Sequence, residues 1–233
     1  MMRPVKKGGR PKDKNGKEVR FTKYAKARGL LIECLGEYCS YCEMHLDASL
    51  AVEHVQPKSV NPSKELDWDN FLLACTNCNS TKGNKEIIEG RYLWPDKDNT
   101  FAAFKYTDEG LVFPADSLPE ALERKARDTI SLTGLNKTPL NSKASDRRWL
   151  NRRETWGMAE ESKKDLCTNN TEQMRKQITR TAMASGYWSI WMTVFQDDPD
   201  MVRRFIDSHP GTCRECFDES DNFKPAPRPG GIC

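Results

Sequence analysis

The sequence has no long apolar run, few histidines and too few cysteines for a disulfide scaffold. Its longest apolar run, residues 188–195, is interrupted by a serine and a threonine and is far too short to cross a bilayer. The basic N-terminus has no apolar segment behind it, so we expect no secretory signal. Nine cysteines in 233 residues are too sparse for a disulfide-stapled secreted domain. These absences exclude a membrane protein and predict a cytoplasmic one. In that reducing compartment, closely spaced cysteines bind zinc more often than they form disulfides.

The composition is that of a folded chain with solvated extensions. Apolar residues make up 37% of it and charged residues 30%, which excludes a wholly disordered protein. Periodicity and turn residues predict helices over 22–35, 117–132, 146–165, 171–195 and 200–208, and a hairpin over 104–113. Gly36 is placed to end the first helix, and Ser117 with Glu120 forms a capping box for the second. Residues 225–231, rich in Pro and Gly, predict an irregular tail.

Positive charge is concentrated at the N-terminus. Residues 1–28 contain eleven Lys and Arg against two acidic residues, a balance of +9. The remainder has 26 basic and 32 acidic residues, a balance of −6. Prolines and glycines oppose an early helix, so we predict a flexible arm that lies along phosphates. A solvated tail, or one that docks on an acidic partner, is the alternative.

Two Cys-x-x-Cys pairs bracket a short segment, and their members are Cys39, Cys42, Cys75 and Cys78. Zinc binds four soft ligands at tetrahedral corners, and each tight pair supplies two of them. The repeated spacing therefore predicts a structural zinc site with four cysteine ligands. The alternative, four reduced core cysteines, leaves the equal spacing of the pairs unexplained.

The segment between and after the first pair carries further polar motifs. It reads Val52-Glu53-His54-Val55-Gln56-Pro57, then Asn70-Phe71-Leu72-Leu73, then Cys75-Thr76-Asn77-Cys78-Asn79-Ser80-Thr81-Lys82. In this order the motifs resemble those of the HNH endonucleases of the ββα-metal fold. That family has a Cys-x-x-Cys knuckle, an acid-His pair before a proline, an Asn-Leu-Leu run and Cys-x-x-Cys-Asn-x-x-Lys. Here Phe71 stands between the asparagine and the two leucines.

The resemblance implies a role for each of five residues. Glu53 and Asn79 are the expected ligands of a catalytic divalent metal, and His54 is the expected general base. Asn70 is expected to fix the His54 loop, and Lys82 completes the motif. Asn79 stands where the family often has histidine, and the first metal position is a glutamate. One carboxylate and one amide oxygen suit Mg²⁺ or Mn²⁺ completed by water and phosphate, rather than tightly bound zinc.

Elementary chemistry supports His54 independently of the resemblance. Phosphodiester hydrolysis needs an activated water on one side of phosphorus and stabilisation of the departing oxyanion on the other. An imidazole with a reference pKa of about 6.5 can take a proton at neutral pH. Because side chains alternate along a strand, Glu53 and His54 face one phosphate only near a strand end or bulge. Pro57 is consistent with a strand that ends there. Asn79 and Lys82 share a face if a helix begins after the second pair.

A narrower resemblance covers more of the chain. Residues 39–43, 52–59, 66–75, 132–136 and 146–148 look like the PtuB-type HNH proteins, which accompany a PtuA-type ATPase in bacterial Septu and some retron antiphage systems. This resemblance implies a nuclease that an ATPase holds in check and that infection releases. The sequence leaves the choice of DNA or RNA open.

Several residues outside the motifs have a structural and a functional interpretation. Cys213 and Cys216 indicate a loop with reduced thiols, or half of another metal site. Trp188, Trp191, Met192 and Phe195 follow helical spacing, which favours core or partner interface over base stacking. Four arginines are compatible with phosphate contact or with a solvated helix face: Arg147, Arg148, Arg152 and Arg153.

The expected architecture is α+β, with a ββα-metal HNH core, a four-cysteine structural zinc and a mainly helical C-terminal region. Its regions are a basic arm over 1–28, the nuclease core over 29–95, a hairpin and connecting helix over 96–143, and helices with an irregular tail over 144–233. The expected activity is metal-dependent endonucleolytic hydrolysis of nucleic acid. The alternative is a zinc-stabilised nucleic-acid or partner-binding module without catalysis. The retained set of Glu53, His54 and Asn79 favours the enzyme.

Overall fold

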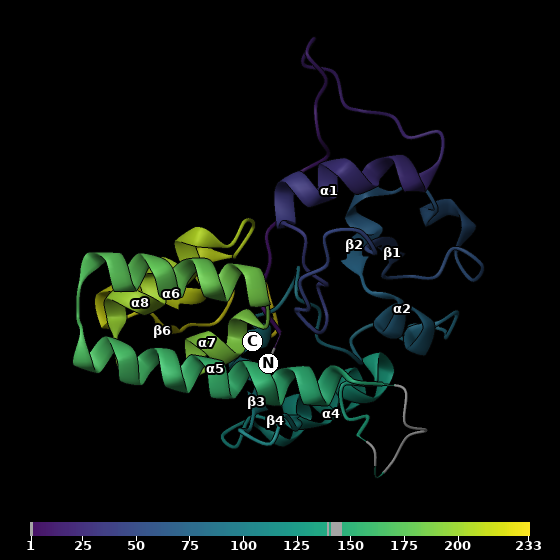
Figure 1. Cartoon of the computed structure of the whole chain (residues 1–233). Helices are drawn as coiled ribbons and strands as arrows, with labels where there is room; N and C mark the ends of the chain where they lie inside the picture. Colours follow the sequence, from purple (N-terminus) through teal and green to yellow (C-terminus); the bar gives the residue numbers. More distant parts are fainter. Residues whose placement is uncertain (1, 139, 141–145) are drawn as a thin grey trace.

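A computed structural model describes residues 2–138, 140 and 146–233 of the chain (Figure 1). The helices are α1 (Arg28–Leu35), α2 (Thr76–Lys82), α3 (Thr100–Ala103), α4 (Glu120–Thr133), α5 (Arg148–Thr168), α6 (Glu172–Ser185), α7 (Trp188–Val194) and α8 (Pro199–Ser208). The strands are β1 (Ala51–His54), β2 (Phe71–Ala74), β3 (Phe104–Tyr106), β4 (Val112–Pro114), β5 (Phe217–Asp218) and β6 (Lys224–Pro225). They pair in sequence order into small antiparallel sheets. Among the described residues, no helix has the length and apolar character needed to cross a membrane. The mixed α+β class is confirmed.

The segment with both cysteine pairs is built from β1, β2 and α2. The two strands are antiparallel, with Ala51 opposite Ala74 and His54 opposite Phe71. Helix α2 begins where the Cys75 sulfur accepts the backbone N–H of Cys78, and it ends at Gly83, whose φ is 54°. Because α2 packs against β1, the end of the strand and one face of the helix lie together.

The first residues of the chain are packed into the body of the protein. Met2 and Val5 are fully buried, and Val5 forms an antiparallel bridge with Thr212. The Arg3 guanidinium donates to the carbonyls of Leu35 and Pro210 over 2.7 and 2.6 Å. The prediction of a flexible arm is therefore wrong for residues 2–7. Two apolar side chains and one buried guanidinium fix this stretch between segments far apart in the sequence.

The predicted hairpin and the helix after it are present, but the capping box is not. Strands β3 and β4 pair with Lys105 opposite Phe113. Helix α4 begins at Glu120 after Pro119, without a side-chain cap, so the predicted start at Ser117 is wrong. Pro119 occupies the N-cap position, where it has no side-chain acceptor to offer the first turn. Gly134, in the left-handed conformation, ends the helix through its N–H.

The predicted helix over 171–195 is two helices, α6 and α7, divided at Gly186 and Tyr187. Both residues have positive φ, 73° and 54°. The backbone of Gly186 lies against the first cysteine loop, where a Cβ would lie 2.7 Å from the Glu43 carbonyl oxygen. The Tyr187 N–H donates to that same carbonyl over 2.9 Å. The helix breaks because the chain docks there, which periodicity alone does not reveal.

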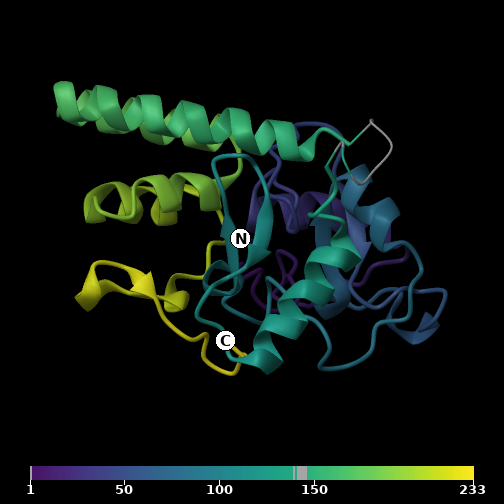
Figure 2. The same cartoon turned by 90° about the horizontal axis from the view of Figure 1, so that it is seen from below.

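The C-terminal helices have a core of their own. Trp188, Trp191, Met192 and Phe195 are buried in it, which confirms the prediction of core for this group. Figure 2 shows the later C-terminal helices, in yellow-green and yellow, on one side of the molecule and the cysteine-bearing segment, in blue, on the other. The tail is more regular than predicted, because β6 pairs with β5 and the Asn99 amide donates to the carbonyls of Cys216 and Ala226. The division into four regions stays a prediction.

Candidate functional site

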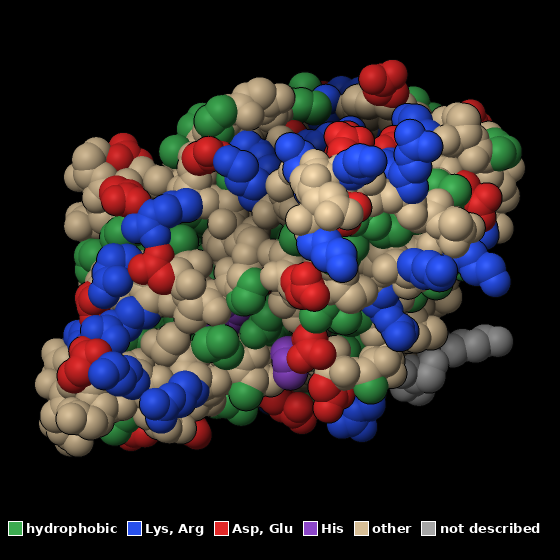
Figure 3. All heavy atoms as spheres, turned by 90° about the horizontal axis from the view of Figure 1, so that it is seen from above, with side chains coloured by type: hydrophobic (Ala, Val, Ile, Leu, Met, Phe, Trp, Pro, Cys, Tyr) green, Lys and Arg blue, Asp and Glu red, His purple; other side chains and the backbone are tan. Residues whose placement is uncertain are grey.

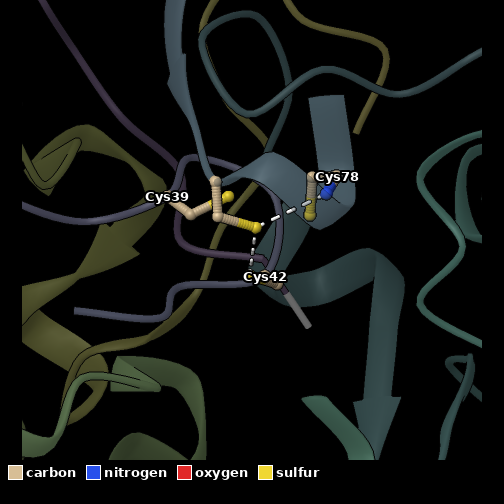
Figure 4. Close-up of side chains that lie close together, drawn as sticks. Cys39, Cys42 and Cys78 are labelled. Carbon is tan, nitrogen blue, oxygen red and sulfur yellow. Dashed lines mark hydrogen bonds between the residues drawn. The ribbon is translucent and has the colours of Figure 1, made fainter. Parts of the chain in front are cut away.

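The four predicted cysteines form one buried cluster. Their sulfur atoms all lie within 4.8 Å of one another, and Figure 4 shows Cys39 and Cys42 of one loop converging with Cys78 of α2. The first cysteine loop is held against β2 because the Ser40 N–H donates to the Leu73 carbonyl over 2.8 Å. The strand thereby brings the second pair to the first. The predicted clustering is confirmed.

The geometry of the cluster fits a zinc ion. Two ligand sulfurs on a tetrahedral zinc, each about 2.3 Å from the metal, are about 3.8 Å apart, and the Cys42 and Cys75 sulfurs are 3.7 Å apart. A disulfide requires about 2.05 Å. Burial raises the pKa of the Cys78 thiol well above its ordinary value, so the thiolate form needs a cation beside it. The residues that would hold zinc are therefore the four cysteines, and zinc itself stays a prediction.

Two buried charged residues connect the cluster to the C-terminal helices. Arg148, at the start of α5, donates from Nη1 to the Cys78 sulfur over 3.0 Å and pairs with Asp146 over 2.6 Å. Glu43, directly after Cys42, accepts the Ser189 N–H over 3.0 Å at the first turn of α7. Groups that hydrogen-bond a metal's ligands orient them and tune their charge. The cysteine cluster therefore also anchors the C-terminal helices.

His54 occupies the last position of β1. The predicted role of His54 as general base requires such a position at a strand end. Its ring lies 4.9 Å from the Tyr24 ring and 5.2 Å from the Phe71 ring. Its Nε2 lies 2.9 Å from the Glu65 carbonyl oxygen. A carbonyl only accepts, so Nε2 carries the proton and Nδ1 keeps its lone pair. Burial lowers the pKa of His54, which favours the neutral ring.

Glu53 points away from His54 and into the protein. It is 4% exposed, and its Oε1 lies 2.7 Å from Lys82 Nζ, in ion-pair contact without hydrogen-bond geometry. Lys82 also donates to the His54 carbonyl over 2.7 Å. Burial raises the pKa of Glu53, and the Lys82 charge opposes that rise. Lys82 thus ties the last turn of α2 to both residues of the acid-His pair.

Asn70 precedes β2 and Asn79 lies on α2, the two elements that flank β1. The Asn70 amide accepts the Gln56 N–H over 2.7 Å and donates to the carbonyls of Gln56 and Lys64 over 2.9 and 3.1 Å. It therefore spans the loop that begins after His54. Asn79, half-buried on α2, lies one turn before Lys82 and on the same helix face. Because Lys82 reaches Glu53, that face is turned toward β1.

Residues 39–85 match the family model of the HNH endonuclease. The match spans both cysteine pairs, β1, β2 and α2, which is the segment where the contacts above converge. It supports the HNH nuclease family for this domain and a nuclease-type function. A search of curated proteins gives no match to the chain.

The sequence did not reveal the roles of two arginines or of Glu43. Arg148 and Arg152 are each 1% exposed, so both expectations for them, phosphate contact and a solvated face, are wrong. Arg152 donates to the carbonyls of Gly110 and Leu135 over 2.8 and 3.0 Å. Acidic and basic residues surround both arginines in the sequence, and this pattern gives no signal of burial.

Cys213 and Cys216 are buried free thiols. In the described part of the chain, the four-cysteine group is the one cluster of three or more metal-ligand side chains.

Proposed function

We propose that the chain is a metal-dependent HNH endonuclease that hydrolyses phosphodiester bonds in nucleic acid. The observation that carries this proposal is the constraint on His54. Its Nε2 is committed to the Glu65 carbonyl, its backbone carbonyl is held by Lys82, and the loop after it is spanned by Asn70. An imidazole fixed by three elements, with one free nitrogen, has the form of a positioned general base.

In this proposal His54 takes the proton of the attacking water at Nδ1. The ring is ready for this step because burial lowers its pKa and keeps it neutral. Neither of the ring contacts that hold it, with Tyr24 and Phe71, uses a polar group. Asn70 keeps the loop in place, so that Glu65 remains where it orients the ring.

The proposed ligands of a catalytic Mg²⁺ or Mn²⁺ are Glu53 and Asn79. A carboxylate has about four acceptor positions, so Glu53 can bind a cation while it keeps its contact with Lys82. An amide oxygen from the facing helix adds the second hard donor that such ions prefer. When bound, the ion neutralises charge on the phosphate and the departing oxyanion. Lys82 holds Glu53 in position, and the four-cysteine zinc holds α2 against β1.

The alternative is a zinc-stabilised binding module without catalysis. The observation that favours it is the burial of Glu53, which is 4% exposed and faces Lys82 rather than solvent. A cation at Glu53 must share this carboxylate with an ammonium group. The two proposals differ in one result, the metal dependence of strand cleavage.

We also propose that the nuclease is the effector of an antiphage system and acts with a PtuA-type ATPase in the cytoplasm. The support for this proposal is the resemblance of the sequence motifs to PtuB-type proteins. Expression of the chain with and without a candidate ATPase in phage-challenged bacteria tests it. Protection that needs both proteins and that disappears with His54→Ala is the expected result.

The main experiment is a cleavage assay on plasmid DNA and on total RNA, with Mg²⁺, Mn²⁺ or no added metal. We expect metal-dependent cleavage of one substrate or both, and cleavage weaker by about two to four orders of magnitude for His54→Ala. A parent protein that binds nucleic acid but cleaves neither substrate under any of these conditions, alone or with the ATPase, points to the binding module.

A further inference from the structure

Residues 10–20 form a short two-stranded projection, which we call the N-terminal hairpin. Lys12 and Glu18 form an antiparallel bridge, and the Val19 N–H donates to the Pro11 carbonyl over 2.8 Å. The Asp13 carboxylate closes the turn by accepting the N–H groups of Asn15 and Lys17 over 2.8 and 3.0 Å. In Figure 1 this segment, the dark purple trace, leaves the body beyond α1. The basic segment therefore has a defined hairpin structure, and it projects away from the core.

The N-terminal hairpin presents unneutralised positive charge. It carries five basic residues against Asp13 and Glu18, and Asp13 is occupied by the turn. Four of the basic side chains belong to exposed residues: Lys12, Lys14, Lys17 and Arg20. Figure 3 views the molecule from the side to which the hairpin projects, and Lys and Arg side chains crowd this face with acidic ones between them. Such a surface attracts polyanions.

The base of the hairpin is attached beside His54. Arg10 donates to the Leu66 carbonyl over 3.1 Å, and the Trp68 indole donates to the Gly8 carbonyl over 3.1 Å. Phe21, directly after the hairpin, lies 6.1 Å from the Phe71 ring, which in turn lies 5.2 Å from the His54 ring. Two ring contacts therefore connect the attached end of the hairpin to His54, the proposed general base.

The length of the hairpin sets how far it reaches. Five residues of extended chain, from either end of the hairpin to its tip, span about 17 Å at about 3.3 Å per residue. Successive phosphates of one DNA strand advance by about 3.4 Å along the helix axis. The tip therefore reaches at most about five base pairs along a duplex from the point where the hairpin base is attached, and the turn that Asp13 closes shortens this reach.

We propose that the N-terminal hairpin binds the phosphate backbone of a nucleic-acid duplex on one side of the cleaved bond, over at most about five base pairs counted from the hairpin base. This inference rests on the proposed function, since it takes the substrate of His54 as its ligand. Attachment beside His54 favours nucleic acid over an acidic protein, because a duplex whose phosphate lies at His54 must continue past the hairpin. The cations contact phosphates rather than bases, so they contribute affinity without sequence preference.

The test compares two triple variants that remove the same charge. One replaces Lys12, Lys14 and Lys17 with glutamine. The other replaces three exposed residues of the C-terminal helices with glutamine: Lys164, Lys176 and Arg180. Both are made in the His54→Ala background, and binding to a 30-base-pair DNA duplex and an RNA duplex is measured against salt concentration. We expect the hairpin variant to lose about tenfold or more in affinity at physiological salt, and its salt slope to fall by about 0.9 for each phosphate contact removed. The helix variant should retain both.

A second measurement separates this inference from the proposed function. In the His54 parent, cleavage of bis(p-nitrophenyl) phosphate, which is too small to reach the hairpin, should be unchanged by the hairpin substitutions, whereas cleavage of long duplexes should weaken through KM. Equal salt slopes for the two triple variants overturn the hairpin proposal even if the parent cleaves DNA. A hairpin variant that also loses activity on the small substrate overturns it too, because the segment then acts on the catalytic site itself.

Discussion

Arg148 donates a hydrogen bond to the sulfur of Cys78 over 3.0 Å, although 70 residues separate the two in sequence. The same guanidinium donates to the carbonyls of Thr133 and Gly134 at the end of α4 over 3.0 and 2.8 Å. One buried cation therefore joins the cysteine cluster, α4 and the first turn of α5. Four thiolates around one Zn²⁺ would leave excess negative charge, which this buried guanidinium would offset.

Replacing Arg148 with glutamine should loosen the cysteine cluster. Asp146 and the Cys78 sulfur lose their buried cation, so we expect the free energy of unfolding to fall by about 3–5 kcal/mol and zinc to pass to a colorimetric chelator faster. The control is Arg147→Gln, which removes the same charge from an exposed neighbour and should change neither quantity. Equal zinc release by both variants would show that Arg148 does not act on the cluster.

Replacing Cys42 with serine should remove the metal and unfold the segment around β1 and β2. Zinc binding at such sites is also folding free energy, and Cys42 is buried among the other three sulfurs. We expect zinc content near one per chain in the parent and near zero in Cys42→Ser, with loss of thermal stability. Cys167→Ser, at an exposed cysteine, should keep both. Elemental analysis that finds no zinc in folded parent protein contradicts the assignment.

Substitutions of His54 and Asn79 should lower cleavage in different ways. His54→Ala removes the proton acceptor, so cleavage should fall by about two to four orders of magnitude, with folding and zinc content intact. Asn79→Ala should weaken metal binding, so its activity should partly recover at higher Mg²⁺ or Mn²⁺. A metal titration of both variants separates base from ligand. Parental cleavage by His54→Ala refutes the assignment of this site.

Acidification should destabilise the protein through His209. This ring is 2% exposed, its Nδ1 lies 2.9 Å from the Phe205 carbonyl, and its Nε2 has no hydrogen-bond partner among the described residues. Burial, with the nearby charge of Arg3, lowers the pKa of His209 to about 3. In the unfolded chain its pKa is about 6.5, so between these values only the unfolded state takes up the proton. The free energy of unfolding should therefore fall by about 1.4 kcal/mol per pH unit from this group as pH drops from 6.5 to 3.

The measurement is denaturant unfolding of the parent and of His209→Asn between pH 7.5 and 4. The difference at pH 7.5 gives the packing cost of the substitution, and the change in that difference with pH isolates the histidine. We expect the two stability curves to converge as the pH falls. Parallel curves would mean that His209 titrates alike in both states.

Local sequence patterns were sufficient to predict the cysteine cluster and the HNH motifs. Ligand spacing is a local property, so the two Cys-x-x-Cys pairs were sufficient to predict the cluster that the structure confirms. The order of the acid-His pair, Asn70 and Asn79 was likewise sufficient for the HNH resemblance that the family match supports. The roles of Glu53, His54, Asn70, Asn79 and Lys82 stay predictions, although the contacts among four of them agree with those roles.

Which charges are buried and where long helices break depend on contacts between distant segments, and local sequence patterns did not predict them. Arg148 and Arg152 have charged neighbours in sequence, yet they are buried because free backbone carbonyls at the ends of α4 and of the β3–β4 turn need donors. Gly186 breaks a periodic helix because Glu43 and His45 of the first cysteine loop lie against it. Gly186 meets a loop more than a hundred residues away in sequence, and the two arginines reach carbonyls 14 to 42 residues away. No local pattern encodes such partners, because burial is a property of the whole packed core.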